Sequence, residues 1–148
     1  MDDRSEADTG RTGDSQTGGC LCGAVRYRLD GEPVMCVTCH CRNCQRQAGS
    51  ALSIILGVRE DELTIEGEVK TYRDTGDSGA EVRRQFCGTC GSALFTRLDH
   101  TPGLMFIKAG TLDDTSQLAP AFHCYARSKQ AWTPLGDIPA YDTVPPGL

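Results

Sequence analysis

Seven of the nine cysteines fall into three short groups whose spacing suits metal binding. They are Cys20 and Cys22, then Cys39, Cys41 and Cys44, and finally Cys87 and Cys90. In an extended chain, residues i and i+2 point to the same face, so both thiols of a C-x-C pair can reach one ion. Zinc is commonly bound by cysteine thiolates, and its structural sites are tetrahedral with four protein ligands. The grouping therefore predicts zinc binding.

The first and last groups together predict a closed zinc site. Cys87 and Cys90 lie in a C-x-x-C-G turn, in which Gly88 and Gly91 relieve the tight backbone. Strand-like residues follow this turn, whereas a thioredoxin-type redox pair needs a strand–helix context. We therefore predict one structural zinc that joins the first strand to the hairpin between residues 80 and 98. Its ligands are Cys20, Cys22, Cys87 and Cys90.

The central triplet offers three ligands and leaves two interpretations open. Catalytic zinc sites use three protein ligands and keep one position for water or substrate, where an entering thiol would lose its proton. Alternatively, a fourth ligand closes the site. Cys36 would do so in the pattern C-x-x-C-x-C-x-x-C, and Cys124, His123 and His40 are weaker candidates. His40 stands between two ligands and should point away from the ion. The residues alone favour neither interpretation.

The segments that must position these cysteines are short and strand-like. AVRYRL (24–29) alternates between apolar residues and arginines, as a half-buried strand does. Further strands are predicted at 51–58, 62–72, 80–86, 92–98 and 104–112. Only short helical turns are predicted, at 43–49, with Asn43 as a candidate cap, and at 113–119. The sequence therefore predicts an all-β fold of antiparallel sheets.

Length, charge and hydropathy exclude several classes of protein. A chain of 148 residues suits one domain, and a net charge of −5 argues against a nucleic-acid partner. No apolar run has the length of a membrane span, and the N-terminus has no apolar signal core, so we expect a cytoplasmic protein without a membrane partner. In that reducing compartment, clustered thiols are more often metal ligands than disulfides, and an odd cysteine count agrees.

Composition also predicts the boundaries of the domain. Residues 1–17 contain five acids and two arginines among small polar residues, which predicts a disordered acidic tail. The zinc-binding domain is predicted at residues 18–141, followed by a C-terminal tail at 142–148.

Three blocks, GGCLCGAVRY, CHCRNCQRQAGS and FCGTCGSALF, resemble the glutathione-dependent formaldehyde-activating enzyme family, which shares its domain with centromere protein V. The resemblance continues through AGTLDD and FHCYARSKQAW and covers about residues 18–141. In the last segment, four residues occupy positions of a family motif: His123, Ser128, Lys129 and Trp132. Cys36 and Cys124 depart from the family pattern, and we interpret them as small buried hydrophobes. Lys129 and Trp132 are interpreted as features of the fold.

The resemblance implies a zinc-stabilised β-tent fold with two zinc ions. One would be structural, at the four-cysteine group, and the other catalytic, held by Cys39, Cys41 and Cys44. It also implies a carbon–sulfur lyase that reversibly joins glutathione and formaldehyde into S-hydroxymethylglutathione. Zinc would hold the thiolate or polarise the carbonyl. A zinc with three thiolates carries one net negative charge, so it is a weak Lewis acid and a bound thiolate stays nucleophilic.

Two functions from different classes follow from these features. The first is a zinc-dependent lyase acting on a small thiol adduct, with glutathione or a similar thiol as partner. The second is a zinc scaffold that binds other proteins, as in the centromere relative. The basic, low-complexity extension that a chromatin partner would favour is absent from this sequence, so the enzyme is the preferred interpretation.

Overall fold

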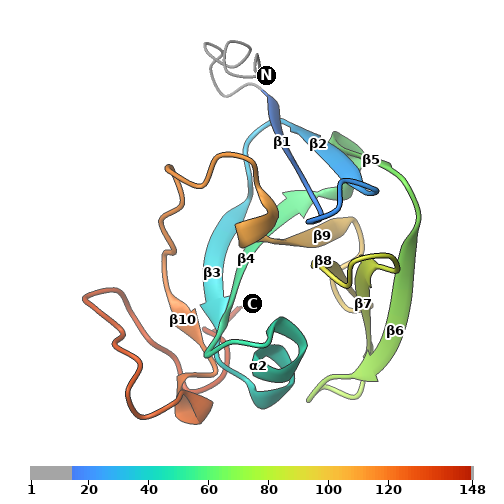
Figure 1. Ribbon diagram of the computed structural model, residues 1–148. Coiled ribbons are helices and arrows are strands. Elements are labelled where there is room, and N and C mark those ends of the chain that lie inside the picture. The colour runs from blue at the N-terminus through green and yellow to red at the C-terminus, as the bar shows by residue number, and fades with distance from the viewer. Residues whose placement is uncertain (1–14, 148) are drawn as a thin grey trace.

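The computed structural model describes residues 15–147, which form two sheets. The smaller sheet has three antiparallel strands in the order β1-β2-β5 (Figure 1). These strands are β1 (Ser15–Gly19), β2 (Arg26–Asp30) and β5 (Leu63–Glu66).

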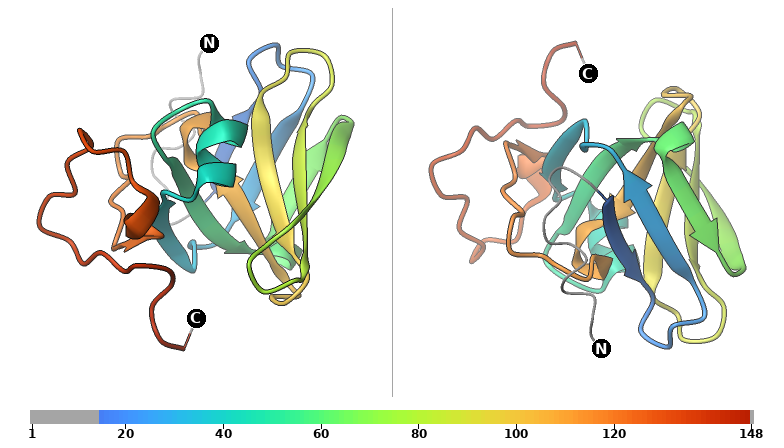
Figure 2. Two further views of the ribbon diagram at one scale, coloured as in Figure 1. Left: turned by 90° about the horizontal axis from the view of Figure 1, so that it is seen from below. Right: turned by 90° about the horizontal axis from the view of Figure 1, so that it is seen from above.

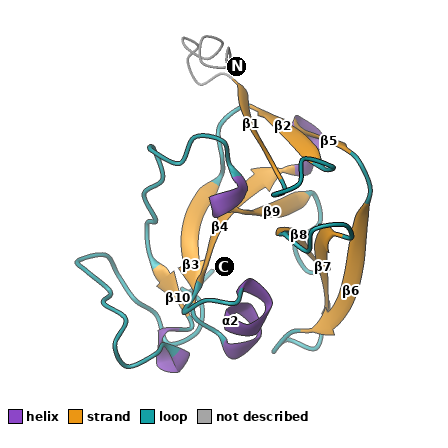
Figure 3. Ribbon diagram, in the orientation of Figure 1, coloured by secondary structure: helices purple, strands orange, loops and turns teal. Residues whose placement is uncertain are grey.

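The larger sheet has seven strands in the order β10-β3-β4-β9-β8-β7-β6. They are β3 (Met35–Cys39), β4 (Ser53–Arg59), β6 (Val69–Thr75), β7 (Glu81–Cys87), β8 (Ala93–Leu98), β9 (Leu104–Lys108) and β10 (His123–Cys124). All neighbouring strands are antiparallel except β10, which runs parallel to β3. Figure 3 shows how strongly strands predominate, so the predicted all-β, β-tent class is confirmed.

One face of the large sheet packs against the small sheet and forms the hydrophobic core. The alternation predicted at 24–29 is confirmed, because Val25, Tyr27 and Leu29 are all buried in this core. Tyr27 meets Phe95 of β8 edge to face, with ring centroids 5.4 Å apart. Ile107 of β9 is fully buried beside them.

The opposite face of the large sheet is covered by one short α-helix, α2 (Arg42–Ala48). In Figure 1, α2 lies on the concave side of the sheet, and Figure 2 shows the same arrangement from below and above. The helix begins at Cys41, whose Sγ accepts a hydrogen bond from the Cys44 backbone N–H at 3.2 Å. The candidate cap at Asn43 was therefore wrong. A left-handed Gly49 ends the helix.

Several predicted boundaries differ from those observed. The segment 62–72 divides at Gly67, which has φ 98°, and its two halves join different sheets. The end of the segment 104–112 forms a 3-10 turn, η2 (Ala109–Thr111), and residues 113–119 form a loop with one hydrogen-bonded turn instead of a helix. Two further 3-10 turns, η1 (Glu60–Glu62) and η3 (Ala126–Ser128), complete the described elements.

The ends of the domain also differ from the prediction. β1 begins at Ser15, so residues 15–17 pair with β2 and are not part of a disordered tail; the rest of the predicted tail lies outside the described residues. At the other end, the Tyr125 N–H donates to the Thr143 carbonyl, which attaches part of the predicted C-terminal tail to the fold. Within residues 15–147, no helix has the length and apolar character needed to cross a membrane.

Candidate functional site

The first candidate metal centre lies at the end of the β7–β8 hairpin. Four thiols meet there with all sulfur atoms within 4.8 Å of one another: Cys20, Cys22, Cys87 and Cys90. Two of the Sγ–Sγ distances are 3.7 Å, between Cys20 and Cys22, and 3.8 Å, between Cys22 and Cys87. A regular tetrahedron with Zn–S bonds of about 2.3 Å has edges of about 3.8 Å. The observed spacing therefore fits one zinc ion.

Backbone N–H groups surround this four-cysteine cluster. The Val25 N–H donates to the Cys20 sulfur at 3.2 Å, and the Thr89 N–H donates to the Cys87 sulfur at 3.3 Å. Ser92 holds the facing loops together, because its hydroxyl accepts from the Leu21 N–H at 3.0 Å and lies 3.2 Å from the Cys90 sulfur. Such donors offset the negative charge of bound thiolates.

The second candidate metal centre lies where β3 passes into α2. Cys39 ends the strand, Cys41 caps the helix and Cys44 lies in its first turn. The three sulfur atoms lie within 4.8 Å of one another, and no fourth Cys, His, Asp or Glu joins them among residues 15–147. Cys39 is buried, whereas Cys41 and Cys44 are partly exposed.

Cys36 lies on the other face of the large sheet from this three-cysteine cluster. It is three residues before Cys39 in the same strand, and residues at odd spacing in a strand point to opposite faces. Its thiol packs against the hydrophobic core and lines a cavity of about 240 Å³ together with Met35 and Leu56. Burial raises the pKa of the Cys36 thiol. Cys36 therefore stands apart from the cluster.

The two histidines considered as ligands form a pair of their own. His123 Nε2 donates to the Leu135 carbonyl at 2.8 Å, so its Nδ1 accepts, from Thr38 Oγ1 at 2.6 Å and from His40 Nε2 at 3.2 Å. His40 is fully buried, and its ring faces the ring of His123. This agrees with the expectation that a residue between two cluster cysteines points away from the ion. Burial lowers the pKa of His40 and keeps it neutral.

Cys124 is a buried neighbour of the three-cysteine cluster without being part of it. It pairs in register with Cys39 across the parallel β10–β3 ladder, yet its sulfur does not join the group of three. Burial, reinforced by the charge of Cys44, raises the pKa of Cys124 to about 11. The thiol is therefore protonated at neutral pH, in agreement with a packing role.

Among the three thiols of the cluster, Cys44 alone has a lowered pKa. Hydrogen bonds from Cys39 and Cys41 lower the pKa of Cys44 to about 2, and the charges of Lys108 and Arg84 act in the same direction. Hydrogen bonds to Cys41 and Cys44, together with burial, raise the pKa of Cys39, and the pKa of Cys41 is raised as well. The negative charge of the metal-free cluster is therefore centred on Cys44.

Arg84 is the residue of this site that the sequence analysis did not single out. It is buried, and its Nε donates to Asp74 Oδ2 at 3.0 Å. The segment 80–86 was predicted as a strand, and the alternation places Arg84 on the same face as Val82. In a strand, a charged residue two positions from an apolar one shares its face, and this spacing from Val82 is the signal that could have identified Arg84.

The remaining family positions hold the C-terminal loop against α2. Lys129 Nζ donates to three backbone carbonyls, those of Gln130, Ala131 and Thr133, which agrees with a role in the fold. Gln45 of α2 is buried and donates to the Ser128 carbonyl at 3.0 Å. Trp132 is 71% exposed, and its indole N–H donates to the Gln130 side chain.

Known proteins are similar to this chain in sequence and in fold. A protein of Halomonas elongata is 31% identical over 121 residues, covering 78% of this chain and 77% of its own length. A protein of Aspergillus flavus is 28% identical over 147 residues, covering 87% of this chain and 76% of its own. Both are named, provisionally, as glutathione-dependent formaldehyde-activating enzymes.

The fold itself recurs in a crystal structure of a Rhodobacter sphaeroides protein, with a TM-score of 0.56 at 21% identity, covering 84% of this chain and 99% of that one. A family model described as glutathione-dependent formaldehyde-activating enzyme matches residues 15–128, a range that includes all three cysteine groups. This chain belongs to the glutathione-dependent formaldehyde-activating enzyme family.

Proposed function

We propose that this protein is a zinc-dependent carbon–sulfur lyase that reversibly joins a small thiol, glutathione, to formaldehyde. The observation that carries the proposal is the meeting of Cys39, Cys41 and Cys44 without a fourth candidate ligand among residues 15–147. A set of three protein ligands suits a metal ion that keeps one position for a substrate. The names of the two relatives, which specify glutathione and formaldehyde, support this choice of substrates.

The proposal assigns two zinc ions to the chain. The four-cysteine cluster would hold the structural ion, and the three-cysteine cluster would hold the ion at the reactive site. A zinc ion in the second cluster supplies the positive charge that keeps an entering thiol deprotonated at neutral pH. Because all nine cysteines are free thiols, we further propose that the protein works in a reducing compartment, the cytoplasm.

The protein's residues have separate tasks in the proposed reaction. In the forward direction the S–H bond of the thiol breaks, a bond forms between its sulfur and the carbonyl carbon, and the carbonyl oxygen takes up the proton as a hydroxyl group. Cys39, Cys41 and Cys44 would hold the zinc ion, whose positive charge would stabilise the thiolate of the substrate. Gln45 fixes α2, and with it Cys44, through its hydrogen bonds to the His40 and Ser128 carbonyls at 2.7 and 3.0 Å.

An exchange measurement tests this proposal, because the adduct also forms without a catalyst. Carbon-13 exchange spectroscopy on a mixture of labelled formaldehyde and glutathione measures the rate at which free and thiol-bound formaldehyde interconvert. We expect zinc-loaded protein to raise this rate in proportion to its concentration, and Cys44→Ser protein to leave it at the rate in buffer. A zinc-loaded parent that leaves the rate unchanged would contradict the enzyme and favour the scaffold.

A further inference from the structure

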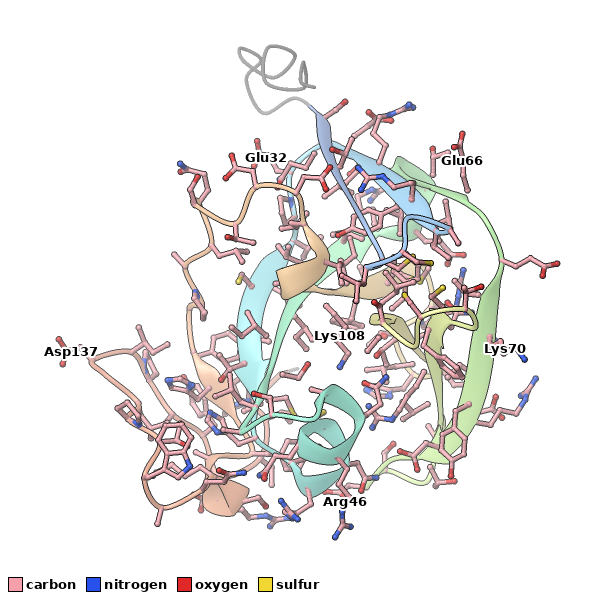
Figure 4. The ribbon with its side chains drawn as sticks, in the orientation of Figure 1. Glu32, Arg46, Glu66, Lys70, Lys108 and Asp137 are labelled. Atoms are coloured by element: carbon pink, nitrogen blue, oxygen red, sulfur yellow. The ribbon has the colours of Figure 1, made fainter. Side chains whose placement is uncertain are left out.

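Two buried cations face the three-cysteine cluster from the large sheet. Lys108 and Arg84 each have only 7% of their surface exposed. The strand registers place both residues on the α2 side of the sheet, since Arg84 pairs with Thr96, Thr96 pairs with Phe106, and Phe106 precedes Lys108 by two residues. Figure 4 shows Lys108 between the sheet and α2. Neither cation is needed to fill the hydrophobic core, which lies on the opposite face.

One strand, β4, separates Lys108 of β9 from Cys39 at the end of β3. Lys108 Nζ donates to Ser53 Oγ at 2.8 Å, and Ser53 is the register partner of Cys39. Among residues 15–147 no ion pair joins Lys108 to a carboxylate, and its hydrogen-bond partner is Ser53. Burial lowers the pKa of Lys108, and the charges of the cluster cysteines act in the opposite direction. A buried ammonium group without a counterion is strongly unfavourable, so this cation depends on the negative charge of the cluster.

Arg84 divides its charge between two partners. Its Nε donates to Asp74 Oδ2 at 3.0 Å. The pKa of Arg84 is raised: burial lowers it, but the negative charges of Cys44 and Asp74 outweigh burial. Asp74 in turn accepts a hydrogen bond from Asn43 of α2 at 3.1 Å, which connects the edge of the sheet to the helix that carries Cys44. Arg84 is therefore held by Asp74, which also contacts the helix of the cluster.

We propose that Lys108 and Arg84 are positioning residues that make the three-cysteine cluster selective for an anionic thiolate over a neutral ligand. The proposal rests on the proposed function in that a thiol binds at this cluster. One zinc ion and three thiolates leave a single negative charge, and an entering thiolate makes it two. Lys108, Arg84 and Asp74 together supply one positive charge, which offsets the cluster alone and leaves only one excess negative charge after the thiolate has bound.

The charge balance predicts different consequences for charged and neutral ligands. Without Lys108, a thiolate would have to enter a buried region that already carries a net negative charge, and Coulomb repulsion there is only weakly screened. A neutral ligand such as imidazole brings no charge, so its affinity should not depend on the positive charge of Lys108. The ratio of the two affinities therefore reports the role of the cations, whereas a general distortion of the site would weaken both ligands alike.

Cobalt-substituted full-length protein provides the test, because its visible absorption changes when a ligand enters the open position. We titrate parent, Lys108→Met and Lys108→Arg proteins at pH 8 with 2-mercaptoethanol, glutathione and imidazole. We expect Lys108→Met to weaken both thiols by roughly 10- to 100-fold and imidazole by less than about threefold. Lys108→Arg should restore thiol affinity. The response to 2-mercaptoethanol, which has no carboxylate, isolates the charge of the sulfur.

A second pair of variants keeps the test independent of how well Lys108→Met folds. Arg84→Met removes the second cation but keeps Asp74, so the positive charge beside the cluster is lost and thiols should bind roughly three- to tenfold more weakly, with imidazole unchanged. Arg83→Met is the matched control, because Arg83 neighbours Arg84 in β7 but points to the other face and binds Asp99 at 2.9 Å. It should bind all three ligands like the parent.

The outcomes separate this inference from the function on which it rests. If the parent responds to thiols and both cation variants lose thiol and imidazole affinity equally, or lose neither, the selectivity role is overturned and the reactive site stands. If the parent shows no response to any thiol, both proposals are overturned.

Discussion

The two cysteine clusters use the same ligand type in different electrostatic surroundings. Around the four-cysteine cluster, backbone N–H groups of Val25 and Thr89 donate to sulfur, and the Cys22 residue is exposed. Around the three-cysteine cluster, two cationic side chains, Lys108 and Arg84, are buried, and Arg84 is paired with Asp74. Backbone dipoles suit a site whose charge stays constant, whereas a net positive charge suits a site that a further anion enters. This difference agrees with the proposed division into a structural and a reactive centre.

Replacing Cys87 by Ser should have the largest effect. The four-cysteine cluster connects the loop after β1 to the β7–β8 hairpin, and zinc contributes on the order of 10 kcal/mol of apparent folding free energy in small zinc modules. We expect the Cys87→Ser protein to lose its cooperative thermal transition in circular dichroism. A soluble variant that melts cooperatively with the parent's zinc content would remove the distinction between the two clusters.

Replacing Cys44 by Ser should abolish reactivity and keep the fold. The strands remain joined through the four-cysteine cluster, so we expect a cooperative melt, one tightly bound metal ion per chain and no spectral change of the cobalt protein on adding glutathione. Elemental analysis and the cobalt spectrum measure these properties. A Cys44→Ser protein that responds to thiol as the parent does would place the reactive site elsewhere.

Replacing Cys36 by Ala should leave both metal centres intact. The thiol points to the core face, away from Cys39, and its loss removes only one partly buried sulfur, at a cost of roughly 1 kcal/mol in the free energy of unfolding. Urea denaturation and zinc analysis check both expectations. The loss of one zinc equivalent would instead make the second cluster a closed four-cysteine site.

Replacing Asp74 by Asn should have a small effect on thiol binding, opposite in sign to the effect of removing Lys108 or Arg84. Asn keeps the approximate shape of the side chain but removes the carboxylate that neutralises part of Arg84. With more positive charge beside Cys44, thiols should bind the cobalt protein roughly two- to fivefold more tightly. Weaker thiol binding in Asp74→Asn protein, with imidazole binding unchanged, would mean that Arg84 does not act through its charge.

Local patterns in the sequence were sufficient to predict most of the strands and the grouping of the cysteines. Short alternating segments place side chains on two faces, as at Val25, Tyr27 and Leu29, and C-x-C and C-x-x-C spacings bring thiols together without reference to the rest of the chain. β1, β3 and β10 were not predicted. The sequence SQTGG in β1 has no apolar alternation, so the pairing with β2 determines its structure.

The residues that required the structure are those whose role depends on distant strands. The sequence alone did not separate Cys36 from Cys39, because the strand that turns them to opposite faces was not recognised. Lys108 and Arg84 lie 24 positions apart in the sequence and share a face only through the β7–β8–β9 registers. Alternation reveals that a strand has two faces, but not which face meets the core and which meets α2.

Strand β7 carries residues at both clusters, which has a consequence for how one centre influences the other. Arg84 and Cys87 are three positions apart, with a register shift between Gln85 and Phe86 separating them. The strand pairs with β6 and β8 along its length, so a displacement of its Cys87 end would also move Arg84. Loss of metal from the hairpin centre should therefore alter ligand binding at the three-cysteine cluster, although the two centres share no ligand.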